Sequence, residues 1–183
     1  MRDIFFQKFQ ECFVKDESLF FLTGDTGFNL VEQFFEIAPN RALNVGVAEQ
    51  NLVGIAAGLC NAGFVPVCYA ITNFLVHRCL EQIRNDVCLH DLKVVLVGTS
   101  TGYDNGALGA THHMVDDIGC LKPLPNIRIY SPSGRLSMSQ VVDDALADSH
   151  PAFIRISKAD YLESTSVSSP NHLVLNGSND ILL

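Results

Sequence analysis

The chain has 183 residues, a formal net charge of −8 and 48% hydrophobic residues. This length fits one compact domain, and the apolar content is sufficient for a sizeable core, which argues against bulk disorder. The acidic balance argues against non-specific binding of nucleic acid, because such binding needs a basic face. No run of about 18 apolar residues and no apolar signal-peptide core are visible, so we expect no membrane span.

Six cysteines are spread along the chain. They lie within apolar runs such as AAGLCNAG, where a reduced thiol packs as a small hydrophobic group. No CxxC pair and no group of cysteines and histidines has the spacing of a zinc site. We therefore expect reduced core cysteines, no metal ligands in this chain and a cytoplasmic location.

Hydrophobic periodicity predicts helices and strands that alternate through most of the chain. In chain order the expected elements are helix 2–14, strand 19–22, helix 28–37, strand 42–45, helix 49–62, strand 64–69, helix 73–89, strand 93–97, strand 127–130, helix 137–148 and strand 152–156. Gly54 and Gly58 share one face of helix 49–62, where another backbone can approach closely. Gly63 is a plausible C-terminal cap for this helix.

Most of the expected strands are continuous apolar runs, which is typical of a parallel sheet covered by helices on both faces. The pattern predicts a three-layer α/β/α domain over residues 1–158, with a mostly parallel six-stranded sheet. It does not give the order of the strands. Residues 99–120 are too long and too rich in glycine for a simple connection, and such loops are usually functional or disordered. Residues 159–183 are rich in Ser and Asn, and we interpret them as a polar tail or linker.

Glu49 directly precedes an apolar helical run, after the small residues Gly46 and Ala48. A carboxylate at a helix N-terminus is stabilised by the helix dipole, so simple capping explains Glu49 without any catalytic role. A catalytic role is the alternative, and the position of Glu49 alone does not decide between them.

Two further groups could carry chemistry. His112 and His113 lie in the long loop, and they form either an exposed pair or a group that reaches a cleft at the carboxyl edge of the sheet. The loop also carries several aspartates, but its histidine spacing matches no common metal geometry. Phe74 and His77 are three residues apart on one helical face, where an aromatic residue more often belongs to the core.

Three separated segments, taken together, resemble the transketolase family. They are NVGVAEQNLVGIAAGLCNAGFVPV, YAITNFLVHRCLEQIRNDV and GALGATHHMVDDIGCLKPLPNIRIYSPS. They occur in the family's order at suitable spacings, and the resemblance covers roughly residues 22–157. It implies the domain that holds the aminopyrimidine ring of thiamine diphosphate.

The resemblance also implies roles for individual residues. Glu49 would hydrogen-bond the ring nitrogen N1′ and favour the tautomer whose 4′-nitrogen removes the proton from thiazolium C2. Phe74 matches the aromatic residue beside the pyrimidine. Ile71 and His77 would line the same pocket, and His112 matches the histidine that contacts the substrate and moves protons.

The chain departs from the family pattern at several of these positions. Ile71 stands where phenylalanine is usual, and His77 stands where tyrosine is common. His113 replaces a usual glutamine. Leu108 replaces the aspartate of the DGxTH motif, which removes an acceptor for sugar hydroxyls and argues against a standard pentose-phosphate substrate.

The family's GDG…N motif, which holds the diphosphate and Mg²⁺, does not occur in this sequence. We therefore expect a partner subunit that carries this site, in a two-chain transketolase-like enzyme that transfers a two-carbon ketol or acyl unit. The expected assembly is a homodimer or a heterotetramer. The alternatives are a non-catalytic dimerisation or regulatory domain and a β-type subunit of a 2-oxoacid dehydrogenase. Retention of Glu49, Phe74 and His112 together favours the enzyme.

Overall fold

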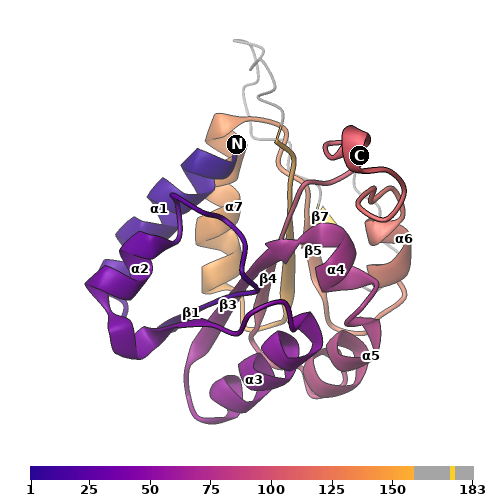
Figure 1. Cartoon of the computed structure of the whole chain (residues 1–183). Helices are drawn as coiled ribbons and strands as arrows, with labels where there is room; N and C mark the ends of the chain where they lie inside the picture. The colour runs from indigo at the N-terminus through magenta and orange to yellow at the C-terminus, as the bar shows by residue number, and fades with distance from the viewer. Residues whose placement is uncertain (159–173, 176–183) are drawn as a thin grey trace.

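Parallel strands form the centre of the computed structural model of the chain, which describes residues 1–158 and Val174–Leu175 (Figure 1). The sheet order is β2-β1-β3-β4-β6-β5-β7. The first six strands are mutually parallel, and β7 pairs antiparallel with β5. Their bounds are β1 (Leu19–Thr23), β2 (Ala42–Asn44), β3 (Val65–Ile71), β4 (Val95–Thr99), β5 (Arg128–Tyr130), β6 (Ala152–Ile156) and β7 (Val174–Leu175).

Helices cover both faces of this sheet (Figure 1). One layer contains α1 (Arg2–Lys15), α2 (Glu32–Ile37) and α7 (Arg135–Ala147). The other layer contains α3 (Glu49–Asn61), α4 (Thr72–Val76), α5 (Leu80–Gln82), the π-helix η2 (Ile83–Cys88) and α6 (Asp117–Leu121). Short 3₁₀ turns occur at η1 (Pro39–Arg41) and η3 (Gly106–Leu108). This arrangement confirms the expected three-layer α/β/α domain with its six parallel strands.

The strands alternate their side chains between the two helix layers. In β3, Val67 and Tyr69 pack with α1, α2 and α7, whereas Cys68 and Ala70 pack with α3 and α4. All four residues are at most 1% exposed. Because both faces of the central strands are buried, most of the strands are continuous apolar runs, which is the pattern that predicted a parallel sheet.

Two expected helices differ from those in the structure. The helix expected over 28–37 begins only at Glu32, because Gly27 and Asn29 have φ values of 90° and 66°, outside the right-handed helical region. The helix expected over 73–89 is divided into α4, α5 and η2. The thiol of Cys79 contacts the carbonyl oxygen of Phe74 at 3.4 Å, in the turn between α4 and α5.

The polar tail expected over 159–183 lies outside the described residues, apart from the two residues of β7. No helix in the part of the chain that the structure describes is long and apolar enough to cross a membrane.

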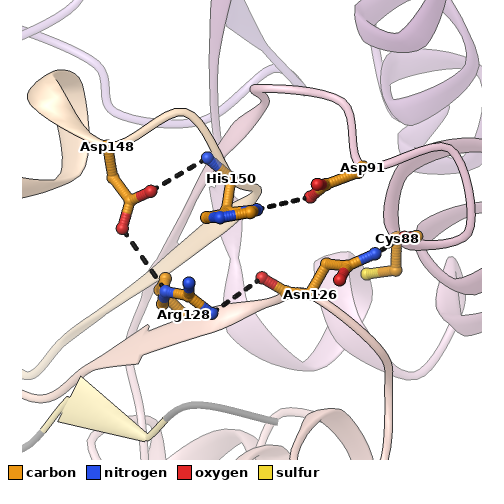
Figure 2. A network of polar contacts seen from close by, with 6 residues as sticks. All are labelled: Cys88, Asp91, Asn126, Arg128, Asp148 and His150. Atoms are coloured by element: carbon orange, nitrogen blue, oxygen red, sulfur yellow. Dashed lines mark hydrogen bonds and ion pairs between the residues drawn. The ribbon is translucent and has the colours of Figure 1, made fainter.

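A polar network ties together the amino-terminal edge of the sheet (Figure 2). His150 lies 2.7 Å from Asp91 and donates its backbone N–H to Asp148, which in turn pairs with Arg128. The side-chain amide of Asn126 donates to the carbonyl oxygen of Cys88. These groups connect the segments that precede β4, β5 and β6. Ligands of parallel sheets bind at the opposite, carboxyl edge. We therefore assign the His150–Asp91 pair a role in stabilising the fold and not in binding a ligand.

Gly98 in β4 allows α4 to dock closely on the sheet. A Cβ atom at this position would lie 2.6 Å from Thr72 Oγ1 and 2.8 Å from Phe153 Cε2. Thr72 is the first residue of α4, and its hydroxyl donates to the carbonyl oxygen of Thr99 at 2.8 Å. Both contacts leave no room for a methyl group.

We predict that Gly98→Ala lowers the free energy of unfolding by about 1–3 kcal/mol, the usual cost of overpacking a core. Gly119→Ala is the matched control, because a Cβ atom there meets nothing within 4 Å. Urea denaturation of both variants measures the difference. Equal stabilities would show that β4 and α4 can separate without cost.

Candidate functional site

Glu49 lies beside the point where the order in which the chain adds strands to the sheet reverses. The chain leaves β1 towards β2 on one side and leaves β3 towards β4 on the other, so β1 and β3 flank the topological switch point. Ligands of open α/β sheets bind at the carboxyl ends of the strands at such a point. A Cβ atom at Gly24, just after β1, would lie 3.4 Å from Glu49 Cγ and 3.8 Å from Ala70 Cβ in β3. Glu49 is therefore at the position that the fold provides for a ligand.

The carboxylate of Glu49 is buried, with the residue only 2% exposed. Arg78 Nη1 contacts Glu49 Oε2 at 2.5 Å. A buried charge is stable only when it is paired, so Arg78 supplies the compensation that burial requires. The Arg78 side chain is itself 41% exposed, which places the ion pair at the boundary between core and solvent.

The same guanidinium group covers an aromatic ring. The Arg78 Cζ atom lies 4.5 Å from the centroid of the Phe74 ring, which is within the range of a cation–π contact. Phe74 and Arg78 are four residues apart, the spacing of neighbours on a helix face. Arg78 was not among the site residues expected from the sequence, although this spacing from Phe74 was a usable signal.

His112 also lies against the Phe74 ring. Their ring centroids are 5.1 Å apart in a T-shaped arrangement. His112 Nδ1 is 2.9 Å from the hydroxyl of Thr111, and the side-chain amide of Asn73 donates to the carbonyl oxygen of Thr111. The contacts thus run continuously from Glu49 through Arg78 and Phe74 to His112.

The loop over 99–120 is fixed to the end of β6 at two places. The side chain of Asp117 is 1% exposed and lies 2.6 Å from Arg155 Nε. Asp104 accepts a hydrogen bond from the backbone N–H of Lys158 at 2.6 Å. The loop expected as one irregular segment also contains α6. These anchors hold the backbone that presents His112.

The remaining expected site residues lie around this group without joining its chain of contacts. Ile71 ends β3 and is half-buried directly before α4. His77 Nε2 lies 3.1 Å from Asp116 Oδ1, so this ring faces α6 instead of Glu49. His113 Nε2 is 3.3 Å from the carbonyl oxygen of Gly106.

Leu108, the residue expected to affect substrate choice, and His113, which replaces a usual glutamine, also lie in the loop. Leu108 is 59% exposed at the end of η3. His113 additionally contacts Tyr103, with 5.1 Å between the ring centroids. An exposed leucine here offers an apolar surface where a carboxylate would offer a hydrogen-bond acceptor.

All six cysteines have free thiols. Cys79, next to the site, is buried, and its burial raises the pKa of the thiol to about 12, with a further contribution from Glu49. The thiol is therefore protonated near neutral pH. It adds no charge beside the Glu49–Arg78 pair.

A buried carboxylate and an aromatic ring at the switch point of a parallel sheet have the chemistry that binding a flat nitrogen heterocycle requires. The carboxylate can share a proton with a ring nitrogen, and the Phe74 ring offers an apolar surface for the heterocycle. Glu49 and Phe74 therefore fit an aminopyrimidine ring.

The family model for the transketolase pyrimidine-binding domain matches residues 1–163. The chain belongs to this family. It is 37% identical over 152 residues to an apulose-4-phosphate transketolase subunit of Actinobacillus succinogenes, covering 83% of this chain and 48% of that protein. It is 30% identical over 157 residues to a 6-deoxy-6-sulfo-D-fructose transketolase subunit of Clostridium sp., covering 85% and 49%. The chain thus spans about half the length of these relatives.

Solved structures show the same fold. A split-gene transketolase described as an inactive beta4 tetramer superposes with a TM-score of 0.79 at 27% identity, covering 93% of this chain and 54% of that chain. The transketolase of Leishmania mexicana superposes with a TM-score of 0.75 at 20% identity, covering 89% and 26%.

Proposed function

We propose that the chain is the pyrimidine-binding part of a thiamine-diphosphate-dependent, transketolase-like enzyme that transfers a two-carbon unit. The observation that carries this proposal is the buried carboxylate of Glu49, which lies at the switch point in contact with Arg78 and close to Phe74. Helix capping alone does not require burial, because a capping carboxylate functions at the surface.

Each residue of the site has a distinct role in this proposal. Arg78 engages Glu49 Oε2, so we assign Oε1 to the hydrogen bond with N1′ of the pyrimidine. Phe74 packs beside the ring, and Ile71 forms an aliphatic wall. His112 is placed to contact the substrate and to move a proton, since its ring borders Phe74. His77, whose ring faces Asp116, has no contact with the pyrimidine in this proposal.

When bound, thiamine diphosphate supplies the electron sink for the transfer. We propose that a partner subunit holds its diphosphate and Mg²⁺. The absence of a GDG…N motif from the 183 residues supports this division, as do relatives named as subunits. The apolar Leu108 favours a substrate other than a standard pentose phosphate. A cytoplasmic location stays a prediction.

Two other functions were open from the sequence. A β-type subunit of a 2-oxoacid dehydrogenase is less well supported, because the relatives are named as transketolase subunits and 1-deoxy-D-xylulose-5-phosphate synthases. A non-catalytic dimerisation or regulatory domain would not need the Glu49 carboxylate for turnover. A single substitution separates that function from the enzyme.

We predict that Glu49→Gln, assayed with the partner subunit, lowers turnover by a factor on the order of 10² or more. Glutamine keeps the shape and a hydrogen bond to Arg78, but it cannot exchange a proton with N1′. The melting temperature should change little. Exchange of the C2 proton of the cofactor, measured by NMR, should slow in parallel with turnover.

Glu32→Gln is the matched control, because Glu32 also opens a helix but is exposed. It should leave turnover and C2 exchange unchanged. If Glu49→Gln also leaves C2 exchange as fast as in the wild type, Glu49 only caps α3 and the proposed role is wrong.

We also predict that the chain alone binds thiamine diphosphate weakly or not at all, even with Mg²⁺ present. The contacts provided by Glu49 and Phe74 reach only the uncharged pyrimidine end of the cofactor. Isothermal titration calorimetry of the chain with and without its partner measures the difference. Micromolar binding by the chain alone would refute the divided site.

The assembly that we propose is a homodimer, or a heterotetramer with the partner. Gly54 and Gly58 lie on an exposed face of α3, where added Cβ atoms would meet nothing within 4 Å. Because the two glycines carry no side chains, a second backbone can approach this face closely. The family's active sites lie between chains, and α3 begins with Glu49.

We therefore expect Gly58→Arg to weaken assembly without unfolding the chain, because arginine favours a helix more than glycine does. Light scattering at several concentrations, with and without partner, reports the mass. Gln140→Arg on the exposed side of α7 is the control and should not change it. A wild type that is strictly monomeric with and without partner would exclude the proposed assembly.

A further inference from the structure

Three possible metal ligands from two separate segments meet beside α4 and α6. They are His77, which follows α4, Asp116, which precedes α6, and Cys120 within α6. One ligand atom from each residue lies within 4.8 Å of the other two. His77 and Asp116 are exposed and Cys120 is half-buried, so the group is open to ions from solvent.

The cluster owes its geometry to the fold. Asp116 and Cys120 are four residues apart, and the N–H of Cys120 donates to the carbonyl oxygen of Asp116 at 2.9 Å, so both lie on one side of the first turn of α6. His77 comes from the broken helical segment after β3, whose turn ends α4 and directs the ring towards α6. Asp116 and Cys120 follow His77 by 39 and 43 residues, so no short motif reveals this group.

The distances suit a tetrahedral cation. Ligand bonds of about 2.0–2.1 Å to nitrogen and oxygen place these atoms roughly 3.3 Å apart in a tetrahedral site. His77 Nε2 and Asp116 Oδ1 are already 3.1 Å apart. The Cys120 thiol lies within 4.8 Å of both atoms, and a tetrahedral site with a metal–sulfur bond of about 2.3 Å would bring it to roughly 3.6 Å from them.

We propose that His77, Asp116 and Cys120 form a binding site for Zn²⁺ or a similar borderline divalent cation. Imidazole and thiolate ligands favour such ions and disfavour Mg²⁺, which prefers oxygen ligands. The site is thus chemically distinct from a magnesium site for a diphosphate. Three protein ligands leave a fourth position open to water or to another ligand.

A cation here would link α4 to α6. Phe74 lies in α4, and His112 lies four residues before Asp116 in the loop that contacts Phe74. Bound metal would therefore restrain both sides of the contact between Phe74 and His112. The nearby Asp117 is already paired with Arg155 and stays outside the ligand set.

The test uses Co²⁺ as a spectroscopic substitute for Zn²⁺ on the full chain, because a cobalt–thiolate bond gives a charge-transfer absorption band. We expect this band in the wild type, its loss in Cys120→Ser, and its competitive removal by Zn²⁺. Loss of one ligand should weaken Zn²⁺ binding by about 100-fold or more, since even supporting contacts behind a ligand contribute about 10–100-fold. Calorimetry of His77→Gln and Cys120→Ser measures this change.

The control variants remove the same types of side chain at positions outside the proposed metal site. Cys60→Ser removes another half-buried thiol, on α3, and His113→Gln removes another histidine of the long loop. Both should bind Zn²⁺ as the wild type does. Circular dichroism shows that each variant is folded. A wild type without a thiolate band, a band that survives Cys120→Ser, or equal losses in the control variants would each overturn the proposal.

Discussion

The carboxylate of Glu49 is buried among the ends of β1 and β3, and Arg78 compensates its charge. The contact between Glu49 and Arg78 depends on the packing of α3 against β1 and on the segment after β3, and it also determines the position of the guanidinium over Phe74. The burial depends on the close approach of α3 to β1 beside Gly24. The compensation depends on a chain segment after β3 that carries Arg78 back over the strand ends. The Arg78 guanidinium then covers Phe74, so the ion pair and the aromatic wall of the site share one side chain.

The parallel sheet explains why these groups meet at one edge. In a parallel sheet, all the strands end at the same edge, and ligands of such sheets bind where the strand order reverses, which here is between β1 and β3. The loop over 99–120 brings His112 against Phe74 at this edge, and it is anchored by Asp117 and Asp104 to the end of β6. The opposite edge carries the His150 network, whose polar groups connect the segments that lead into the strands (Figure 2). The carboxyl edge of the sheet thus carries the candidate site, and the amino-terminal edge carries polar contacts that stabilise the fold.

Much of the fold could be predicted from the sequence because its signal is local. Most of the buried strands are short apolar runs, and the buried phenylalanines of α1 follow a helical period. The predictions failed where long-range packing or unusual backbone angles decide the structure. Gly27 and Asn29 delay α2, and the break between α4 and α5 lies inside a sequence whose pattern is continuously helical. The strand order depends on contacts far apart in sequence, which no local pattern encodes.

The candidate site could be predicted only in part. Family resemblance pointed to Glu49, Phe74 and His112, and the structure brings Phe74 directly to His112 and connects both to Glu49 through Arg78. Arg78 was missed because an exposed arginine in a helical segment looks like an ordinary solvated charge. The cluster of His77, Asp116 and Cys120 was missed because its members come from segments that only the fold brings together.

The most direct test of the central claim is a crystal structure of the chain with its partner subunit and thiamine diphosphate. The claim predicts that N1′ of the pyrimidine lies within hydrogen-bond distance, about 2.6–3.2 Å, of Glu49 Oε1. It also predicts that the ring lies beside Phe74 and that Arg78 stays on Oε2. A pyrimidine ring bound away from Glu49, with its N1′ contacting another residue or solvent, would contradict the account.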